Sequence, residues 1–90
     1  TAVGYDAGKA VTTGVRNTLI GALAGDALTD AGSNVAAGYI ALSANTRGSD
    51  NVAVGRATLE NFNVTTSTST YNTAIGAYAG NDVTTGMLLP

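Results

Sequence analysis

Apolar and polar residues recur along this chain at fixed intervals around a series of glycines. Successive glycines are separated by 17, 17, 17 and then 21 residues, and they are Gly4, Gly21, Gly38, Gly55 and Gly76. The run before each glycine begins with asparagine in the last four copies, at Asn17, Asn34, Asn51 and Asn72. Such a period is typical of a stack in which each repeat contacts only its neighbours. The pattern predicts one array over residues 1–86, with coils starting near residues 1, 17, 34, 51 and 72.

The run before each glycine alternates between branched residues and alanine, and successive side chains of a strand point to opposite faces. Our interpretation is that the branched residues fill the coil. A second apolar column, seven residues after each glycine, is assigned to a second strand on the opposite wall. The predicted interior residues are Val3, Ile20, Val35, Val52, Val54 and Ile75 on the first strand, and Val11, Leu28, Phe62 and Val83 on the second.

The alanine face of the run suits close approach by another surface. Ala36, Ala53 and Ala74 are therefore predicted to contact neighbouring chains, although Leu19 interrupts their column. Only Phe62 and four tyrosines are aromatic, so an isolated core would be thin and association would compensate for it.

A 17-residue coil is too short for a strand-helix unit, and small residues near its far end suit turns. The sequence predicts an all-β, parallel β-roll or β-solenoid of about five 17-residue coils. Four extra residues near residues 65–70 are predicted to form a loop that bulges from the stack and can be deleted without unfolding it. Residues 87–90 end in Pro90 and are predicted to cap the array or begin another segment.

Composition excludes several classes of function. With four basic and six acidic residues, the chain lacks the basic patch that binds nucleic acid. No apolar run is long enough for a membrane helix. The chain has no cysteine or histidine, its acidic residues do not recur in one column, and no phosphate-binding loop is present. We predict neither catalysis nor a metal or cofactor.

Two polar columns have structural interpretations. The asparagines suit a stacked amide ladder or a turn that tolerates positive φ. The threonines Thr12, Thr29, Thr46 and Thr84 could suggest an ice-binding array, but Asp30 and Arg47 interrupt the row beside them. We interpret this column as stabilising turns.

Candidate receptor contacts come from exposed aromatics and from the extra residues, because loops on rigid scaffolds often carry recognition. They are Tyr5, Tyr39, Thr65, Thr66, Ser67 and Thr68.

The motif resembles a known family of repeats. Asn-Thr-Ala-Ile-Gly at 72–76 and Asn-Val-Ala-Val-Gly at 51–55 resemble the head repeats of trimeric autotransporter adhesins. Thr-Ala-Val-Gly-Tyr at 1–5 and the Thr-Thr-Gly breaks at 12–14 and 84–86 are similar to related repeats in phage tail fibres. The resemblance implies a left-handed roll and a homotrimer about a common axis. In it, residues matching Val52, Val54, Thr73 and Ile75 fill the roll, and alanines matching Ala53 and Ala74 face the neighbouring chain.

The expected function is that of a structural or adhesive segment of an extracellular trimeric fibre, most simply a phage tail fibre that presents or spaces a host-recognition surface. A host receptor or glycan is the expected partner, with no nucleic acid and no membrane insertion by this segment. The expected location is extracellular, on a cell or virion surface. The alternatives are a bacterial trimeric adhesin head and a monomeric solenoid that binds ice or a polysaccharide.

Overall fold

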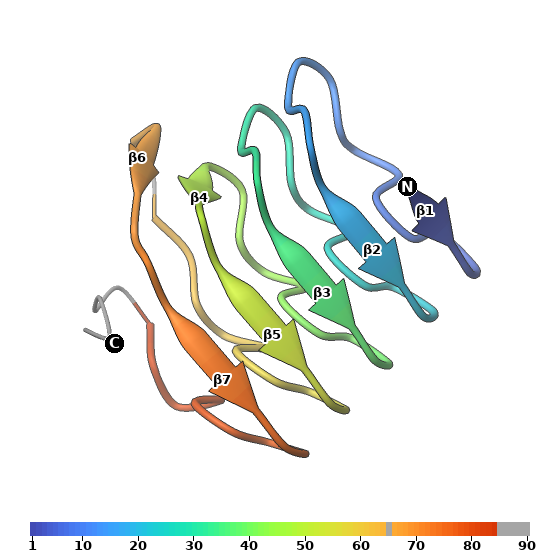
Figure 1. Cartoon of the computed structure of the whole chain (residues 1–90), viewed down its shortest axis with the longest axis vertical. Coiled ribbons are helices and arrows are strands. Elements are labelled where there is room, and N and C mark those ends of the chain that lie inside the picture. The colour runs from blue at the N-terminus through green and yellow to red at the C-terminus, as the bar shows by residue number, and fades with distance from the viewer. Residues whose placement is uncertain (65, 85–90) are drawn as a thin grey trace.

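The chain forms a β-solenoid of about four turns (Figure 1). The computed structural model describes residues 1–64 and 66–84, and this part of the chain contains parallel strands and no helix. The strands are β1 (Ala2–Val3), β2 (Thr18–Ile20), β3 (Val35–Ala37), β4 (Gly48–Ser49), β5 (Val52–Val54), β6 (Thr68–Ser69) and β7 (Thr73–Ile75). The predicted fold class is confirmed, whereas left-handedness and a trimer stay predictions.

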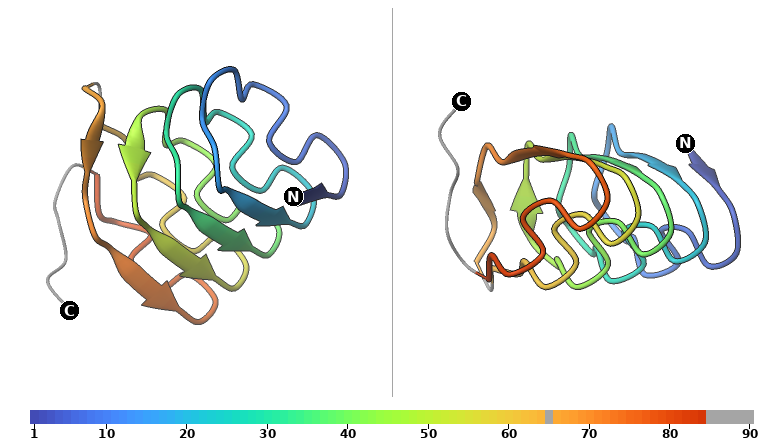
Figure 2. Two further views of the ribbon diagram at one scale, coloured as in Figure 1. Left: turned by 45° about the horizontal axis from the view of Figure 1, so that its top comes forward. Right: turned by 90° about the horizontal axis from the view of Figure 1, so that it is seen from below.

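The repeat period sets the register of the main sheet. Its five strands follow the order β1-β2-β3-β5-β7, and all neighbours are parallel. Ala36 pairs with Ala53, 17 residues later, and Ala53 pairs with Ala74 across the longer coil. Equivalent motif residues therefore lie at the same place on successive coils, and Figure 2 shows the coils stacked beside one another.

The motif glycines allow the turns to stack backbone on backbone. Gly21 has a φ of 120°, a value that L side chains rarely adopt. A Cβ atom added there would lie 2.8 Å from the carbonyl carbon of Gly38 in the next coil. The glycine column thus ends each strand of the sheet and keeps adjacent coils in contact.

The predicted assignment of the two strand faces is wrong. Ala36 and Ala53 are fully buried inside the coil, and Ala74 is 7% exposed. The branched residues point away from the interior: Val3, Ile20 and Ile75 are exposed, and Val35, Val52 and Val54 are half-buried. Alternation defines two faces but not which of them is inside.

The reason lies in the narrow interior, where large side chains of the opposite wall already fill the space. Leu28, Leu42, Leu59 and Phe62 are fully buried and pack with the alanines in one core. Since a core at native density has little empty volume, only small side chains fit opposite them on the sheet.

Leu19 shows the opposite arrangement, in which the large side chain comes from the sheet and the residues facing it are small. It is the large residue in the inward column of the sheet and is 2% exposed. Glycines stand opposite it, and a Cβ atom at Gly8 or Gly25 would approach its methyl groups to 2.7 or 2.8 Å. Leucines stand at the equivalent positions Leu42 and Leu59, in two coils whose inward sheet residues are Ala36 and Ala53.

The second predicted wall is confirmed as interior, but its secondary structure is not. Leu28 and Phe62 are buried, and Val11 and Val83 pack against the core. None of these four residues lies in a strand, because repeated positive φ values fold this wall into turns. The second sheet of the described chain contains β4 and β6 alone.

A buried asparagine ladder runs along the stack through Asn17, Asn34, Asn51 and Asn72. Each of the first three offers its Oδ1 to the backbone N–H of the next asparagine at 3.0 Å. Asn17 Nδ2 donates to the carbonyl of Ala31, and Asn34 Nδ2 donates to that of Gly48. The amide ladder interpretation is confirmed.

Candidate functional site

The most conspicuous surface is the outer face of the five-stranded sheet, which carries Val3, Ile20, Val35, Val52, Val54 and Ile75. Val3 is 57% exposed, Ile20 is 46% exposed and Ile75 is 69% exposed. Parallel sheets in proteins are usually covered on both faces. Here one face covers the interior of the coil, and no other described segment covers the outer face.

The predicted chain-to-chain contacts do not lie on this face. Ala36, Ala53 and Ala74 belong to the hydrophobic core of the coil itself. A neighbouring chain could reach them only by opening the solenoid. This part of the prediction is wrong, and the residues available for association are those that the sequence analysis placed in the interior.

Tyrosines are exposed outside the sheet. Tyr5 is 75% exposed and Tyr39 is 49% exposed, and each follows a motif glycine. Tyr78 is half exposed, and the guanidinium carbon of Arg56 lies 5.5 Å from the centroid of its ring. Tyr5 and Tyr39 are accessible as expected, and their receptor role stays a prediction.

The insert, residues 65–70, is joined to the stack more closely than the sequence predicts. Thr68–Ser69 is strand β6, which pairs in parallel with β4. Thr66, Ser67 and Thr68 are exposed, whereas Thr70 is 1% exposed. Thr65 lies outside the described residues. The expectation of a simple loop bulging from the stack is therefore wrong for its second half.

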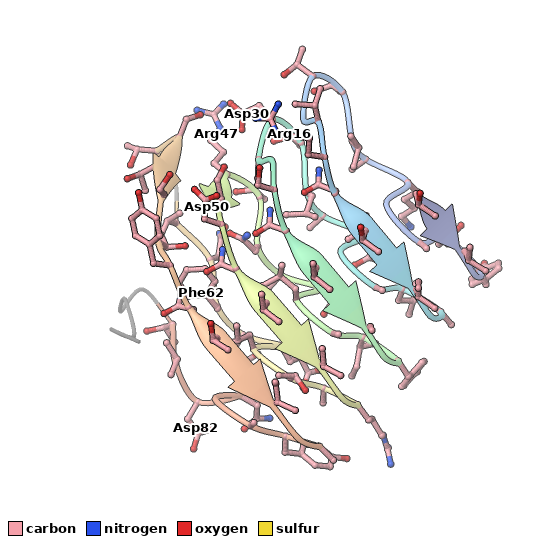
Figure 3. All side chains as sticks on the ribbon, in the orientation of Figure 1. Arg16, Asp30, Arg47, Asp50, Phe62 and Asp82 are labelled. Atoms are coloured by element: carbon pink, nitrogen blue, oxygen red, sulfur yellow. The ribbon has the colours of Figure 1, made fainter. Side chains whose placement is uncertain are left out.

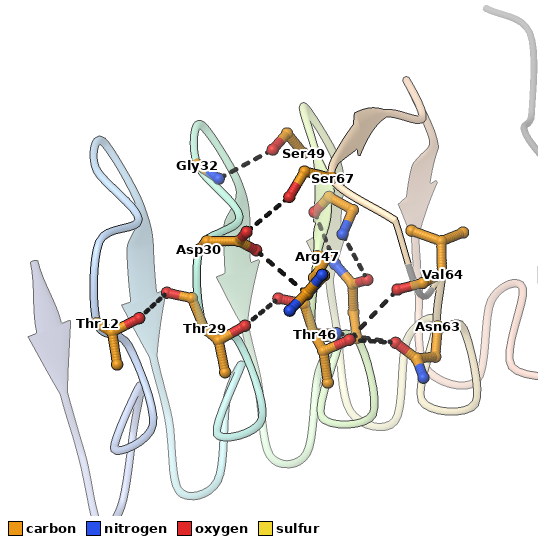
Figure 4. Close-up of polar contacts among 12 residues, drawn as sticks. Thr12, Thr29, Asp30, Gly32, Thr46, Arg47, Ser49, Asn63, Val64 and Ser67 are labelled. Carbon is orange, nitrogen blue, oxygen red and sulfur yellow. Dashed lines mark hydrogen bonds and ion pairs between the residues drawn. The ribbon is translucent and has the colours of Figure 1, made fainter.

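Side chains of the insert reach two earlier coils. Ser67 donates a hydrogen bond of 2.6 Å to Asp30 Oδ2, 37 residues earlier, and Arg47 Nε lies 3.9 Å from Asp30 Oδ1 (Figure 4). Ser69 donates a bond of 2.5 Å to Asp50 Oδ2. Neither contact was predictable from the sequence, because Asp30 and Asp50 share no column and the register across the insert does not follow the repeat.

The threonine column forms a second polar ladder. Thr12 Oγ1 donates to the carbonyl of Thr29, and Thr29 Oγ1 donates to that of Thr46 (Figure 4). Thr46 Oγ1 continues the series to Asn63 Oδ1 at 2.8 Å. These hydroxyl groups have a structural role, but they bond to the next coil and not, as predicted, within the turns.

No family model, curated protein sequence or solved structure matches this chain.

Within residues 1–64 and 66–84, no group of three or more histidine, cysteine, aspartate or glutamate side chains could hold a metal ion. The described part of the chain also contains no helix with the length and apolarity needed to cross a bilayer. The two features that invite an interaction are the apolar outer face and the polar corner beside the insert.

Proposed function

We propose that this chain is a structural segment of an extracellular fibre, in which copies of the solenoid associate through their outer faces and together form a stiff rod. The observation that carries the proposal is the row of exposed Val3, Ile20 and Ile75 on one parallel sheet. Burying apolar surface is the main favourable term in most protein association. A second copy of the chain is the best-suited partner for this face, because the outer face of that copy is equally apolar and exposed.

The arrangement of this row supports a self-associating rod over a site for an unrelated partner. The outer face is contributed by every strand of the main sheet, so it runs the full length of the stack. No Lys, Arg, Asp or Glu lies within these strands. Identical chains placed side by side around an axis would bury the row continuously, and the resemblance to fibre and adhesin repeats makes three chains our specific proposal.

An oligomeric rod also gives an adhesive function a physical basis. Each copy presents the same exposed tyrosines and the same insert, so an assembly offers several identical contact surfaces at once. Weak contacts then gain avidity when they engage together. We propose a role in presenting or spacing a host-recognition surface outside the cell, on a virion or a bacterium.

The test is the solution mass of the chain by light scattering at several concentrations. We expect three times the chain mass, falling to that of one chain only on strong dilution. A chain that stays monomeric at all concentrations would overturn the fibre proposal. It would instead favour a monomeric solenoid that uses one face for ice or a polysaccharide.

A further inference from the structure

A polar groove of about 290 Å³ lies at the corner where the coils run into the main sheet. Its lining includes Arg16, Asp30, Ser33, Ser49, Asp50 and Ser69. None of these residues belongs to the outer face of the sheet. Figure 3 shows Arg16, Asp30, Arg47 and Asp50 gathered at this end of the coils, away from Phe62 and Asp82.

The insert orients both carboxylates of the groove. Ser67 Oγ donates to Asp30 Oδ2, and Ser69 Oγ donates to Asp50 Oδ2. In each carboxylate, one oxygen is thereby held in place and Oδ1 accepts no hydrogen bond from the described residues. Asp30 Oδ1 is also buried. Arg47 Nε lies 3.9 Å from this oxygen, and because Oδ1 is buried, the oxygen of Asp30 that remains for a ligand in the groove is Oδ2.

A donor stands at the other end of the groove. Arg16 Nε donates to Ser33 Oγ at 3.2 Å, and the guanidinium carries further N–H groups that this bond does not use. Ser49 Oγ accepts the backbone N–H of Gly32 at 3.0 Å, which fixes a second wall of the groove. The groove therefore presents fixed acceptors and fixed donors side by side.

The charges of this corner balance. Asp30 and Asp50 contribute two negative charges, and Arg16 together with Arg47, beside Asp30, contributes two positive charges. A phosphate or a metal ion would meet as much repulsion as attraction. A neutral molecule rich in hydroxyl groups can donate to the carboxylates and accept from the guanidinium without carrying a charge into the groove.

An aromatic ring continues the row. Arg16, Ser33, Asp50 and Tyr71 each precede a ladder asparagine, so they occupy successive levels of one column. Tyr71 is 58% exposed and stands one level beyond Asp50. Tyr71 does not line the groove, so the contacts available to a ligand there are mainly polar.

We propose that this groove binds a neutral saccharide. Asp30 and Asp50 accept hydrogen bonds from its hydroxyl groups, and Arg16 donates to it. The volume lies near the lower limit of small-molecule sites, roughly 300–1,000 Å³, which fits a ligand of about one or two rings. The biological setting of the site rests on the proposed fibre function, but the groove is complete within one chain.

The test is a titration of the whole ¹⁵N-labelled chain with maltose, cellobiose and diacetylchitobiose, followed by two-dimensional NMR. Inorganic phosphate and calcium chloride serve as charged probes. We expect saturable shifts of the amides of Ser33, Ser49, Asp50 and Ser69 with at least one disaccharide. No saturable shift at these amides with any of the three sugars, or tighter binding of phosphate or calcium there, would overturn the proposal.

A pair of matched variants assigns the effect to the groove. Asp50 has a φ of 65°, and asparagine tolerates that conformation, so Asp50→Asn should keep the fold. Losing the charged acceptor should weaken saccharide binding about tenfold. Asp82→Asn makes the same change at an exposed residue outside the groove and should leave binding unchanged. Equal effects of the two variants would overturn the assignment.

Assembly is measured by light scattering on the same samples, so the two proposals can fail separately. A chain that assembles and binds no saccharide overturns the groove and leaves the fibre. A monomer that binds saccharide at the groove overturns the fibre and leaves the groove.

Discussion

The hydroxyl group of Thr70 donates a hydrogen bond of 2.8 Å to Asn51 Oδ1, which joins the insert to the buried asparagine ladder. The same oxygen, Asn51 Oδ1, also accepts the backbone N–H of Asn72. Thr70 is almost completely buried, whereas Ser67, three residues earlier, is exposed. The two ends of the insert therefore contribute unequally to stability.

Replacing Thr70 with valine should lower the free energy of unfolding by about 1–3 kcal/mol, because a buried donor is lost while the shape is kept. Ser67→Ala removes an exposed hydrogen bond and should change it by less than about 0.5 kcal/mol. Urea denaturation followed by circular dichroism measures both.

Deleting residues 67–70 should destabilise the chain more than either substitution, contrary to the sequence-based expectation. Equal stability of the deletion variant and the unchanged chain would contradict the structural role of Thr70.

Placing a charge on the outer face should separate association from folding. Ile20→Glu puts a carboxylate where copies are proposed to meet, and burying it unpaired there would be costly. We expect light scattering to give the mass of one chain, with the far-UV circular dichroism of the β-solenoid retained. Val15→Glu alters another exposed aliphatic residue outside the sheet and should leave the assembled mass unchanged. An Ile20→Glu variant that keeps the assembled mass would argue against this interface.

Ala53→Glu should have a different effect, because Ala53 is fully buried within the coil. A charged side chain there has neither space nor a partner, so the chain should unfold rather than merely dissociate. Circular dichroism and proteolysis would detect the loss of structure. A folded monomer would instead restore the original assignment of the alanine face to chain contacts.

Gly21 and Gly76 provide a matched pair for the stacking of turns. Their φ values are 120° and 123°, so alanine meets similar backbone strain of about 1–3 kcal/mol at both positions. At Gly21, however, the added Cβ atom would also collide with the backbone of Gly38, whereas at Gly76 the nearest described atom is Ala79 Cβ at 4.0 Å. Gly21→Ala should therefore lower the denaturation midpoint much further. Equal midpoints in urea would show that contact between successive turns contributes little.

The asparagine ladder can be tested in its middle. Asn34 Oδ1 accepts from the backbone and side-chain nitrogens of Asn51, so Asn34→Ala leaves a buried N–H without this acceptor. We expect a loss of about 2–4 kcal/mol from the lost bonds and the cavity together. Asn61→Ala, which removes an exposed bond to the carbonyl of Asn81, should cost less than about 0.5 kcal/mol. A small effect at Asn34 would mean that water replaces the ladder.

The repeat itself was predictable because stacking imposes the same requirement on every coil. Gly21 and Gly38 must both allow close backbone approach, and Asn34 and Asn51 must both bond to the next level, so residue type recurs with the period. The second wall was partly predictable for the same reason, since Leu28 and Phe62 are large and apolar in one column.

The repeat did not reveal which face of the sheet points inward, and it did not reveal the groove. Ala53 is inside because of Leu59 and Phe62 from the other wall, and no periodicity in the sheet column reveals how much space they leave. Asp30 and Asp50 meet the insert because the extra residues shift the register: Thr46 bonds to Asn63, 17 residues later, whereas Gly48 pairs with Thr68, 20 residues later. That shift depends on the pairing of β4 with β6, which does not follow the 17-residue period.

The register of 17 residues between bonded neighbours such as Asn17 and Asn34 also has a mechanical consequence. When the two ends of the stack are pulled apart, the bonds between coils are loaded one level at a time, so an end coil peels away before the next one opens. Each ordinary coil would release roughly 60 Å of extended chain, and the coil with the insert roughly 70 Å. A tether built in this way lengthens in steps and limits the tension that reaches whatever it holds.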